Sequence, residues 1–234
     1  MEQDYSLNQK TEPYRKKLER YYRLHSIIYD WTRWSFLFGR EELLYHIPDL
    51  PPNSRILEVG CGTGKNLITL EYLFPDARIY GIDLSLEMIR RARAKMQDDG
   101  QVKLIHGTYG DPRYQFEPFN LILLSYSLSM LGNRIPAILE QVHGDLVTDG
   151  YVAVVDFHST RHRWFRNWMK KNHVRMDGQL EPLLDTCFIP QVCDIEHAYL
   201  GLWDYMIYIG RRRSAPFPAS RNRTSPIGHA WQTG

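Results

Sequence analysis

Apolar residues in the middle of the chain occur in short runs, and stretches with helical spacing separate one run from the next. Such runs predict buried strands, and the spaced stretches predict helices that cover them. Strands are expected at residues 55–59, 79–82, 102–106, 119–125 and 151–157. Helices are expected at residues 66–73, 85–96, 135–146 and 161–173. Two last runs, 193–199 and 203–210, flank Gly201 and predict an antiparallel pair.

This alternation predicts an α/β fold with a doubly wound, mostly parallel sheet and an antiparallel strand near the C-terminus. Before the first strand, residues 14–46 have helical spacing and many aromatic residues, with a break at Gly39. We therefore expect one domain over residues 14–212. Within it, residues 14–50 are expected to form a helical cap on a core of residues 51–212.

The turn after the first predicted strand contains Gly60, Gly62 and Gly64. Glycines at such a turn adopt positive φ and let the backbone approach a ligand closely, and the amides of the following helix face that ligand. Asp83 closes the second strand, nineteen positions after the last glycine, where a carboxylate accepts the hydroxyls of a ribose. The stretch therefore predicts a site for a nucleoside-bearing cofactor.

The spacing of the glycines indicates which nucleoside. A dinucleotide fingerprint needs a glycine at position 65, where Lys65 stands, and no G-K-[ST] sequence completes a phosphate-binding loop. The pattern E-x-G-x-G-x-G, from Glu58 to Gly64, resembles motif I of class I S-adenosylmethionine (SAM) methyltransferases. The resemblance implies a Rossmann-like fold and SAM as cofactor. The alternative is a tight strand–helix turn in an ordinary Rossmann-like scaffold.

The same resemblance implies a set of cofactor contacts. Glu58 would position the methionine moiety or order the glycine loop, and Leu84 and Met88 would border the adenine, although core packing explains Met88 equally well. Many class I enzymes carry an acidic residue just after the third strand. This chain has none there until Asp111, so a hydroxyl or backbone group would replace it. The implied cofactor residues are Glu58, Gly60, Cys61, Gly62, Thr63, Gly64, Asp83, Leu84, Met88, Thr108, Ser125 and Tyr126.

Five segments are similar to bacterial betaine-lipid N-methyltransferases: Tyr21–Glu41, Leu57–Leu67, Ser125–Leu131, Val154–Phe157 and Leu202–Arg212. In that family the amino group of diacylglyceryl-homoserine is methylated three times, so the resemblance implies a lipid headgroup as substrate. It also implies an aminocarboxypropyl transferase as the partner that makes the acceptor.

Other functions stay open. They are methylation of another small amine, phenol or quinone-type acceptor, transfer of the aminocarboxypropyl group of SAM, and a non-catalytic SAM-binding subunit. Nucleic acid is disfavoured as a substrate, because Ser125-Tyr126-Ser127 stands where an N-P-P-Y-type motif would follow the fourth strand.

Methyl transfer to an amine requires an unprotonated nucleophile, so a base or a water path must remove a proton. Tyr126, Asp156 and His158 lie at predicted carboxyl ends of strands and are the candidate catalytic residues. Tyr126 has an alternative role as a hydrogen-bond partner of the amine, and Asp156 as a cap of local backbone.

The aromatic N-terminal segment supplies the candidate substrate-binding residues Tyr29, Arg33 and Trp34. Ring faces attract a trimethylated ammonium group, so Tyr29 and Trp34 suit an aromatic cage. Arg33 suits a carboxylate or an anionic membrane surface. Aromatic residues at helical spacing are also typical of a core.

Composition limits the class of protein. The 234 residues are 43% hydrophobic and 24% charged, which suits one α/β domain. Residues 211–234 hold five arginines and no acidic residue, so the remainder sums to −3 (24 − 27). Residues 213–234 are therefore expected to form a disordered basic tail, and residues 1–13 to be flexible.

Cysteine usage and hydropathy indicate a compartment. Cys61, Cys187 and Cys193 lack metal-ligand spacing and are odd in number, which argues for a reducing compartment without disulfides or metal. The polar start does not resemble a signal peptide, and no apolar run long enough to span a membrane occurs. Residues 161–173 combine aromatic and basic side chains, which suits either an interfacial helix or an ordinary amphipathic one. We expect a cytoplasmic protein, peripheral at the inner membrane face.

Overall fold

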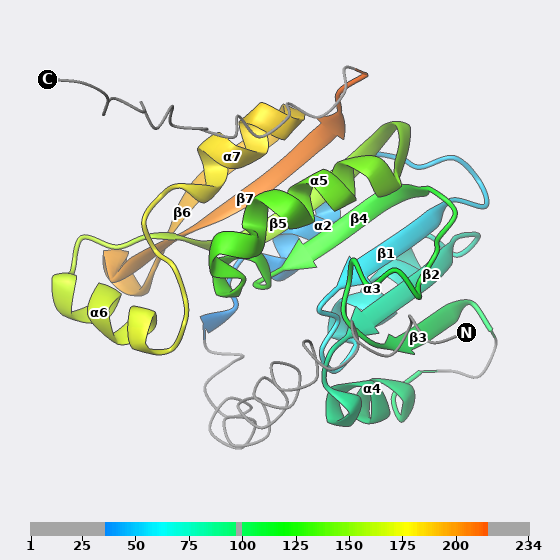
Figure 1. The fold of residues 1–234 in the computed structure, drawn as a ribbon, viewed down its shortest axis with the longest axis horizontal. Helices are drawn as coiled ribbons and strands as arrows, with labels where there is room; N and C mark the ends of the chain where they lie inside the picture. The colour runs from blue at the N-terminus through cyan, green and yellow to red at the C-terminus, as the bar shows by residue number, and fades with distance from the viewer. Residues whose placement is uncertain (1–35, 97–99, 215–234) are drawn as a thin grey trace, which may run out of the picture.

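A seven-stranded sheet in the order β3-β2-β1-β4-β5-β7-β6 forms the centre of the computed structural model, which describes residues 36–96 and 100–214 (Figure 1). The strands are β1 (Arg55–Val59), β2 (Arg78–Asp83), β3 (Val102–His106), β4 (Phe119–Ser125), β5 (Leu146–Ser159), β6 (Phe188–Ala198) and β7 (Trp203–Arg212). Strands β1 to β5 pair in parallel, and β7 runs antiparallel to both β5 and β6. The expected doubly wound, mostly parallel sheet is confirmed.

Helices cover both faces of the sheet (Figure 1). They are α2 (Arg40–Tyr45), α3 (Lys65–Leu73), α4 (Leu86–Arg93), α5 (Ile135–Asp145), α6 (Arg163–Lys171) and α7 (Leu180–Cys187). Buried residues of α2, α3, α4 and α6 join one apolar cluster, and those of α5 and α7 join the other.

Alternation along the central strands separates these two cores. On β4, Leu121 and Leu123 face the first cluster, while Ile122 and Leu124 face the second. Successive side chains of a strand point to opposite faces, so a strand buried on both sides has a continuous apolar sequence. This explains why the run 119–125 was recognisable as a buried strand.

Several boundaries differ from those expected. Helix α6 is shorter than residues 161–173, α4 ends at Arg93, and β5 begins at Leu146, directly after α5. Helix α7 was not expected, although Leu180, Leu184 and Cys187 form its buried side. Three short 3-10 helices were also not expected: η1 (Leu128–Met130), η2 (Gly132–Arg134) and η3 (Tyr199–Gly201).

Gly39 interrupts the N-terminal helical pattern as expected. It precedes α2 with a φ of 71°, a left-handed conformation that glycine adopts without strain. A Cβ at this position would lie 2.5 Å from the Tyr205 ring. Glycine therefore lets the chain before α2 lie directly against β7.

Three sequence-based expectations fall partly or wholly outside the part of the chain that the structure describes. They are the flexible start 1–13, the cap residues before Phe36 and most of the tail 213–234. Within residues 36–96 and 100–214, no helix has both the length and the apolar character needed to cross a membrane. Cys61, Cys187 and Cys193 are free cysteines.

Replacement of Leu67 by alanine is expected to destabilise the fold by about 2–5 kcal/mol, because a buried leucine loses its contacts and leaves a cavity. Leu67 is 0% exposed on α3 and belongs to the first cluster. Its neighbour Ile68 is 39% exposed, so Ile68→Ala is the matched control and should change stability far less. Urea unfolding measures both. Equal shifts of the two midpoints would contradict this account of the core.

Candidate functional site

The glycine loop between β1 and α3 lies at the carboxyl edge of the sheet, where the strand order reverses between β1 and β4. Gly60, Gly62 and Gly64 have φ values of 75°, 54° and 77°. These left-handed values explain the alternating glycines. A Cβ on Gly64 would lie 2.5 Å from Met96 and 3.1 Å from Ala92. Because glycine has no side chain, the end of α4 can pack closely against the loop here. A crevice at this position in open α/β sheets binds ligands.

Hydrogen bonds fasten this loop to the end of β2. The amide of Gly60 donates to the carbonyl of Ile82 at 2.8 Å, and the amide of Gly62 donates to Asp83 Oδ2 at 2.8 Å. Asp83 Oδ1 accepts from the amide of Ser85, also at 2.8 Å. Each carboxylate oxygen has two acceptor sites. The half-buried Asp83 is therefore oriented by the backbone and can still accept a ligand hydroxyl.

Cys61 and Thr63 occupy the positions between the glycines. Cys61 is 5% exposed, and its sulfur would lie 3.0 Å from a Cβ built on Gly81 of β2. It is a small filler between the loop and the sheet. Thr63 is half-buried, and its carbonyl accepts from Lys95 at 3.3 Å.

Glu58 is 2% exposed at the end of β1 and is held by a chain of polar side chains. Its Oε1 accepts from Asn66 Nδ2 at 2.7 Å. The amide oxygen of Asn66 in turn accepts from Arg40 of α2 at 2.8 and 3.2 Å. These contacts connect α2 to β1. They orient the Glu58 carboxylate at the base of the glycine loop.

The residues expected near the adenine follow β2 and β3. Leu84 is half-buried, and its carbonyl contacts the His106 ring at 3.1 Å. Met88 is 6% exposed on α4, and Thr108 is half-buried after β3. Leu84 and Met88 follow Asp83 in the chain. Thr108 follows His106, which pairs with Asp83 on the neighbouring strand.

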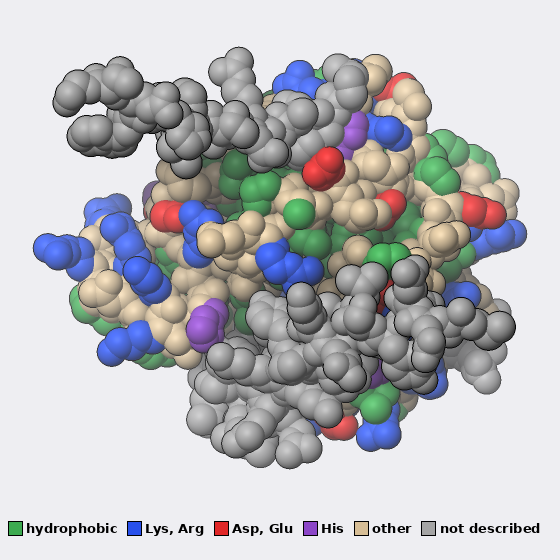
Figure 2. Space-filling view, in the orientation of Figure 1, with side chains coloured by type: hydrophobic (Ala, Val, Ile, Leu, Met, Phe, Trp, Pro, Cys, Tyr) green, Lys and Arg blue, Asp and Glu red, His purple; other side chains and the backbone are tan. Residues whose placement is uncertain are grey.

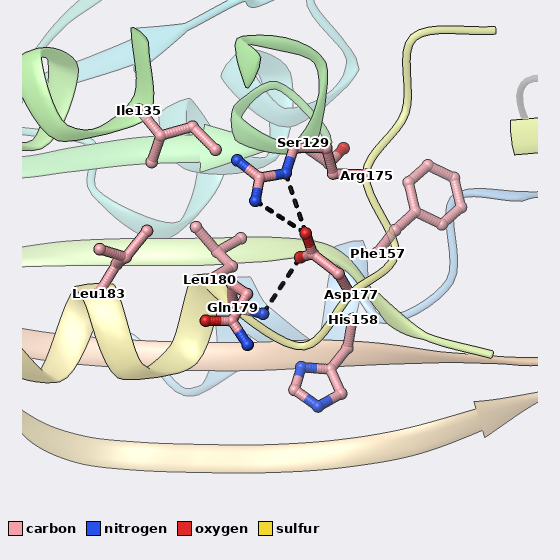
Figure 3. A pocket seen from close by; sticks show the side chains of 9 residues that line it. All are labelled: Ser129, Ile135, Phe157, His158, Arg175, Asp177, Gln179, Leu180 and Leu183. Carbon is pink, nitrogen blue, oxygen red and sulfur yellow. Dashed lines mark hydrogen bonds and ion pairs between the residues drawn. The ribbon is translucent and has the colours of Figure 1, made fainter. Parts of the chain in front are cut away.

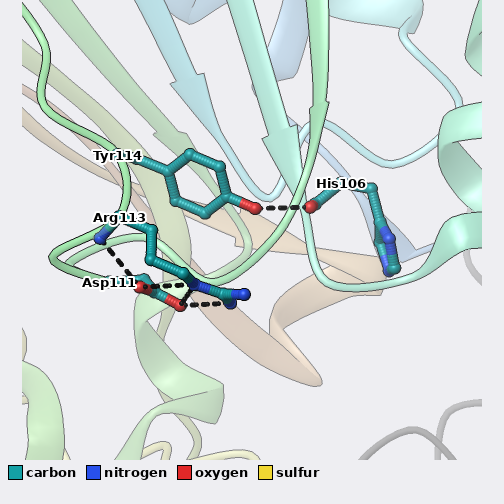
Figure 4. A network of polar contacts seen from close by, with 4 residues as sticks. All are labelled: His106, Asp111, Arg113 and Tyr114. Carbon is teal, nitrogen blue, oxygen red and sulfur yellow. Dashed lines mark hydrogen bonds and ion pairs between the residues drawn. The ribbon is translucent and has the colours of Figure 1, made fainter. Parts of the chain in front are cut away.

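Figure 4 shows the polar contacts that fix the loop after β3. The Asp111 carboxylate accepts from Arg113 at 2.6 to 3.1 Å, and these hydrogen bonds hold the Asp111 pKa below its usual value. Tyr114 donates to the His106 carbonyl at 2.8 Å. Asp111 is thus an ion-pair partner of Arg113, and Thr108 or a backbone group stays the predicted adenine contact.

Ser125 and Tyr126 end β4 against the glycine loop. Ser125 is 7% exposed, and a Cβ on Gly60 would lie 3.3 Å from Ser127. Tyr126 has a φ of 52°, and its hydroxyl donates to the carbonyl of Phe38 at 2.8 Å. Burial raises the pKa of Tyr126 above its ordinary value. This arrangement suits a positioning residue that contacts the segment before α2, and it does not favour proton acceptance.

Asp156 is 0% exposed near the end of β5. Its Oδ2 accepts from the amide of Ser129 at 3.0 Å, and its Oδ1 accepts from the amide of Phe157 at 2.8 Å. Burial raises its pKa to about 6, while these hydrogen bonds act in the opposite direction. The carboxyl therefore fixes η1 onto β5, as the capping alternative of the sequence predicts.

His158 differs from Tyr126 and Asp156 because it lines a cavity (Figure 3). This cavity of about 10 Å³ lies between β5, the start of α5, α7 and the turn that contains Arg175 and Asp177. It has room for about one water molecule. Among the described residues, the buried Nδ1 atom of His158 has no hydrogen-bond partner. Of the three candidate catalytic residues, His158 alone lines this cavity.

The structure thus brings Glu58, the glycine loop, Asp83 and the end of β4 to one edge of the sheet. Sequence reasoning missed Asn66 and its contact with Arg40, although Asn66 follows the glycine motif within the first turn of α3 and a polar residue there is a usable signal. Tyr29, Arg33 and Trp34 lie outside the described residues. Among residues 36–96 and 100–214, no group of three or more His, Cys, Asp or Glu side chains could hold a metal.

Comparison with known proteins agrees with this geometry. Residues 56–150 match the model of a family described as a methyltransferase domain. A demethylmenaquinone methyltransferase of Lysinibacillus sphaericus is 25% identical over 118 residues, which cover 50% of each chain. The matched segments span 41% to 62% of the lengths of three curated relatives.

Two solved structures share the fold at low identity. One is a chain from a complex of the Trm112 methyltransferase activator from Haloferax volcanii, with a TM-score of 0.67 and 14% identity. The match covers 84% of the present chain and 98% of the chain in that complex. Geranyl diphosphate C-methyltransferase from Streptomyces coelicolor, solved with S-adenosyl-L-homocysteine, matches with a TM-score of 0.60 and 13% identity, covering 75% and 80%. Residues 56–150 are thus similar to a methyltransferase domain, and the chain shares its fold with these solved structures.

The buried Asp156 predicts a pH dependence of stability. Its folded pKa of about 6 lies above the ordinary value of 3.8, so the folded protein holds more protons between these values. The advantage is full below pH 3.8 and is lost as the pH rises from there through 6. Relative to Asp156→Asn, the parent should lose about 3 kcal/mol of stability over this range, at about 1.4 kcal/mol per pKa unit.

Urea unfolding at a series of pH values measures this difference. The variant Asp76→Asn, at an exposed turn position, is the control for a general effect of charge. A difference between parent and Asp156→Asn that does not change from pH 4 to pH 7 would contradict the account of Asp156.

Proposed function

We propose that this protein binds SAM at the carboxyl edge of β1, β2 and β4 and transfers its methyl group to the amine of a lipid headgroup, diacylglyceryl-homoserine. The observation that carries the cofactor site is the Gly62–Asp83 hydrogen bond of 2.8 Å within a loop of left-handed glycines. The observation that favours the lipid is the similarity of five sequence segments to betaine-lipid N-methyltransferases.

In this proposal each group has a physical task. SAM supplies a methyl group that is already activated on a sulfonium, so positioning provides most of the acceleration. Asp83 accepts the ribose hydroxyls, and Glu58 orders the side of the site near the methionine moiety. Tyr126 positions the end of β4. The acceptor amine loses one proton per transfer, and His158 or a water beside it takes that proton.

The aromatic segment completes the acceptor side. Tyr29 and Trp34 form a cage for the methylated ammonium group, and Arg33 binds the headgroup carboxylate. The protein works as one domain over residues 14–212, in the cytoplasm at the inner membrane face. An aminocarboxypropyl transferase that makes the acceptor is its proposed partner.

A second candidate is methylation of a small amine, phenol or quinone-type acceptor. The observation that favours it is the similarity to a curated demethylmenaquinone methyltransferase, which is 25% identical over 118 residues. A non-catalytic SAM-binding subunit is a third candidate, and SAM binding without turnover would indicate it.

The acceptor is tested by incubating the purified protein with methyl-labelled SAM and a bacterial lipid extract containing diacylglyceryl-homoserine. Label is expected in the organic phase, in a lipid with a trimethylated headgroup. Label in a quinone or in a water-soluble amine would replace the lipid proposal by the second candidate. SAM labelled in its aminocarboxypropyl chain is the control, and transfer of that label would indicate the other group-transfer reaction.

The cofactor site is tested separately with Asp83→Asn. Loss of charge-assisted hydrogen bonds to the ribose should weaken SAM binding by about 2–4 kcal/mol, or about 30-fold or more. Calorimetry measures the affinity, and Glu87→Gln on α4, exposed and paired with Arg91, is the matched control. The thermal unfolding of both variants is also measured, because Asp83 accepts hydrogen bonds from two backbone amides. Unchanged affinity in a folded variant would remove the ribose role.

A further inference from the structure

We propose that α6 and the turn between β6 and β7 form one docking surface for an anionic lipid bilayer. The surface consists of Trp164 and Trp168 on α6, Tyr199 and Leu200 on the turn, and the basic residues that flank them. This inference goes beyond methyl transfer, since it concerns a face of the molecule and does not depend on the reaction or on the acceptor.

The apolar part of this docking surface is exposed in the folded chain. Trp164 is 64% exposed, Trp168 47%, Tyr199 52% and Leu200 108%. These are large side chains that would otherwise be buried. Isolated exposed apolar residues need no explanation, but four that lie on adjoining elements make a patch of the kind that marks an interaction site.

Ring contacts join the helix to the turn through the fully buried Trp203. Phe165 of α6 stacks on Trp203 with ring centroids 5.4 Å apart, and Tyr199 lies 4.9 Å from the same ring. Phe36 adds a second connection, at 6.3 Å from Trp168 and 6.4 Å from Tyr199. The exposed rings therefore stand on one rigid base.

The turn holds its apolar residues outward in an unusual backbone conformation. Tyr199 and Leu200 have φ values of 47° and 56°, a region that residues with a Cβ rarely adopt. The tight turn between antiparallel β6 and β7 accounts for these left-handed values. It leaves Leu200 fully exposed at the tip of the hairpin.

Charge identifies the occupant as an anionic surface. The basic residues of this docking surface are Arg161, Arg163, Arg166, Lys170 and Lys171, and no acidic residue occurs from 161 to 176. The Arg161 guanidinium lies 3.9 Å from a Cβ built on Gly201, which brings the charge to the turn. Figure 2 shows Lys and Arg side chains gathered over the α6 end of the molecule with hydrophobic side chains among them.

Acidic residues occur on the strands beside the turn: Glu196 stands two residues before Ala198 on β6, and Asp204 follows Trp203 on β7, where it pairs with His197 at 2.7 Å. An amphipathic helix with tryptophan on one side and Lys or Arg around it is the type that lies in the interface of an anionic bilayer. A lipid headgroup would then reach the site without leaving the membrane.

Flotation of the full chain with vesicles tests the docking surface. The parent should float with vesicles of equal phosphatidylglycerol and phosphatidylcholine. It should float much less with phosphatidylcholine alone, and also at 0.5 M salt, where the Debye length is about 4 Å and charges are screened. Trp164→Ala/Trp168→Ala and Leu200→Asn should each lower binding about tenfold. Lys170→Ala/Lys171→Ala should lower it about 25-fold, at about fivefold per charge.

Matched controls use exposed residues outside this face. Tyr72→Ala removes an aromatic side chain that is 84% exposed on α3, and Arg90→Ala/Arg93→Ala removes two exposed charges from α4. Both should float like the parent. Asparagine tolerates a left-handed backbone, so Leu200→Asn should fold normally, as thermal unfolding would verify.

Equal flotation of the docking and control variants would overturn the proposal. So would a change of oligomeric state in Trp164→Ala/Trp168→Ala, or binding of a single-stranded oligonucleotide in place of vesicles. Flotation needs no SAM and no acceptor, so a failure of the methyl transfer proposal leaves its result intact. Calorimetry with SAM should give the parental affinity for every docking variant, and loss of that affinity would also overturn the assignment.

Discussion

The hydrogen bond from the Gly62 amide to Asp83 is the contact on which the site depends. It fixes the glycine loop to the end of β2, and the Gly60 amide repeats this attachment on Ile82. With the loop in place, α3 begins at a defined point and α4 approaches Gly64 closely. A mobile loop would have to be ordered by the ligand, and that ordering would reduce the affinity. Here the backbone is already arranged for a close ligand.

Polar contacts of two kinds surround this loop. Glu58, Asn66 and Arg40 form a connected series from β1 to α2, and Asp156 holds η1 on β5 through the amide of Ser129. Buried polar groups of this type are favourable only when they are well paired, and they then specify one arrangement of their elements. The edges of β1, β4 and β5 are in this way held at fixed positions relative to the segment before the core.

The sequence predicted the strands and the glycine loop well, because local patterns determine both. The continuous apolar run of β4 and the alternating glycines leave direct traces in the order of residues. The Tyr126–Phe38 hydrogen bond joins positions 88 apart, and no local pattern reports such a pairing. The contact between Asn66 and Arg40, 26 positions apart, was missed for the same reason. Helix α7 was missed because eight residues with a proline give a weak periodic signal.

The outer edge of the sheet has a further consequence. Strand β6 ends the sheet beyond β7, and most of its side chains are exposed, including Asp194, Glu196 and His197. Pro190 removes one backbone donor from this edge. Unpaired strand edges recruit other chains into aggregates, and charges and proline are the usual protection against it. The exposed charges and Pro190 of β6 therefore oppose the pairing of two chains into an intermolecular sheet along this edge.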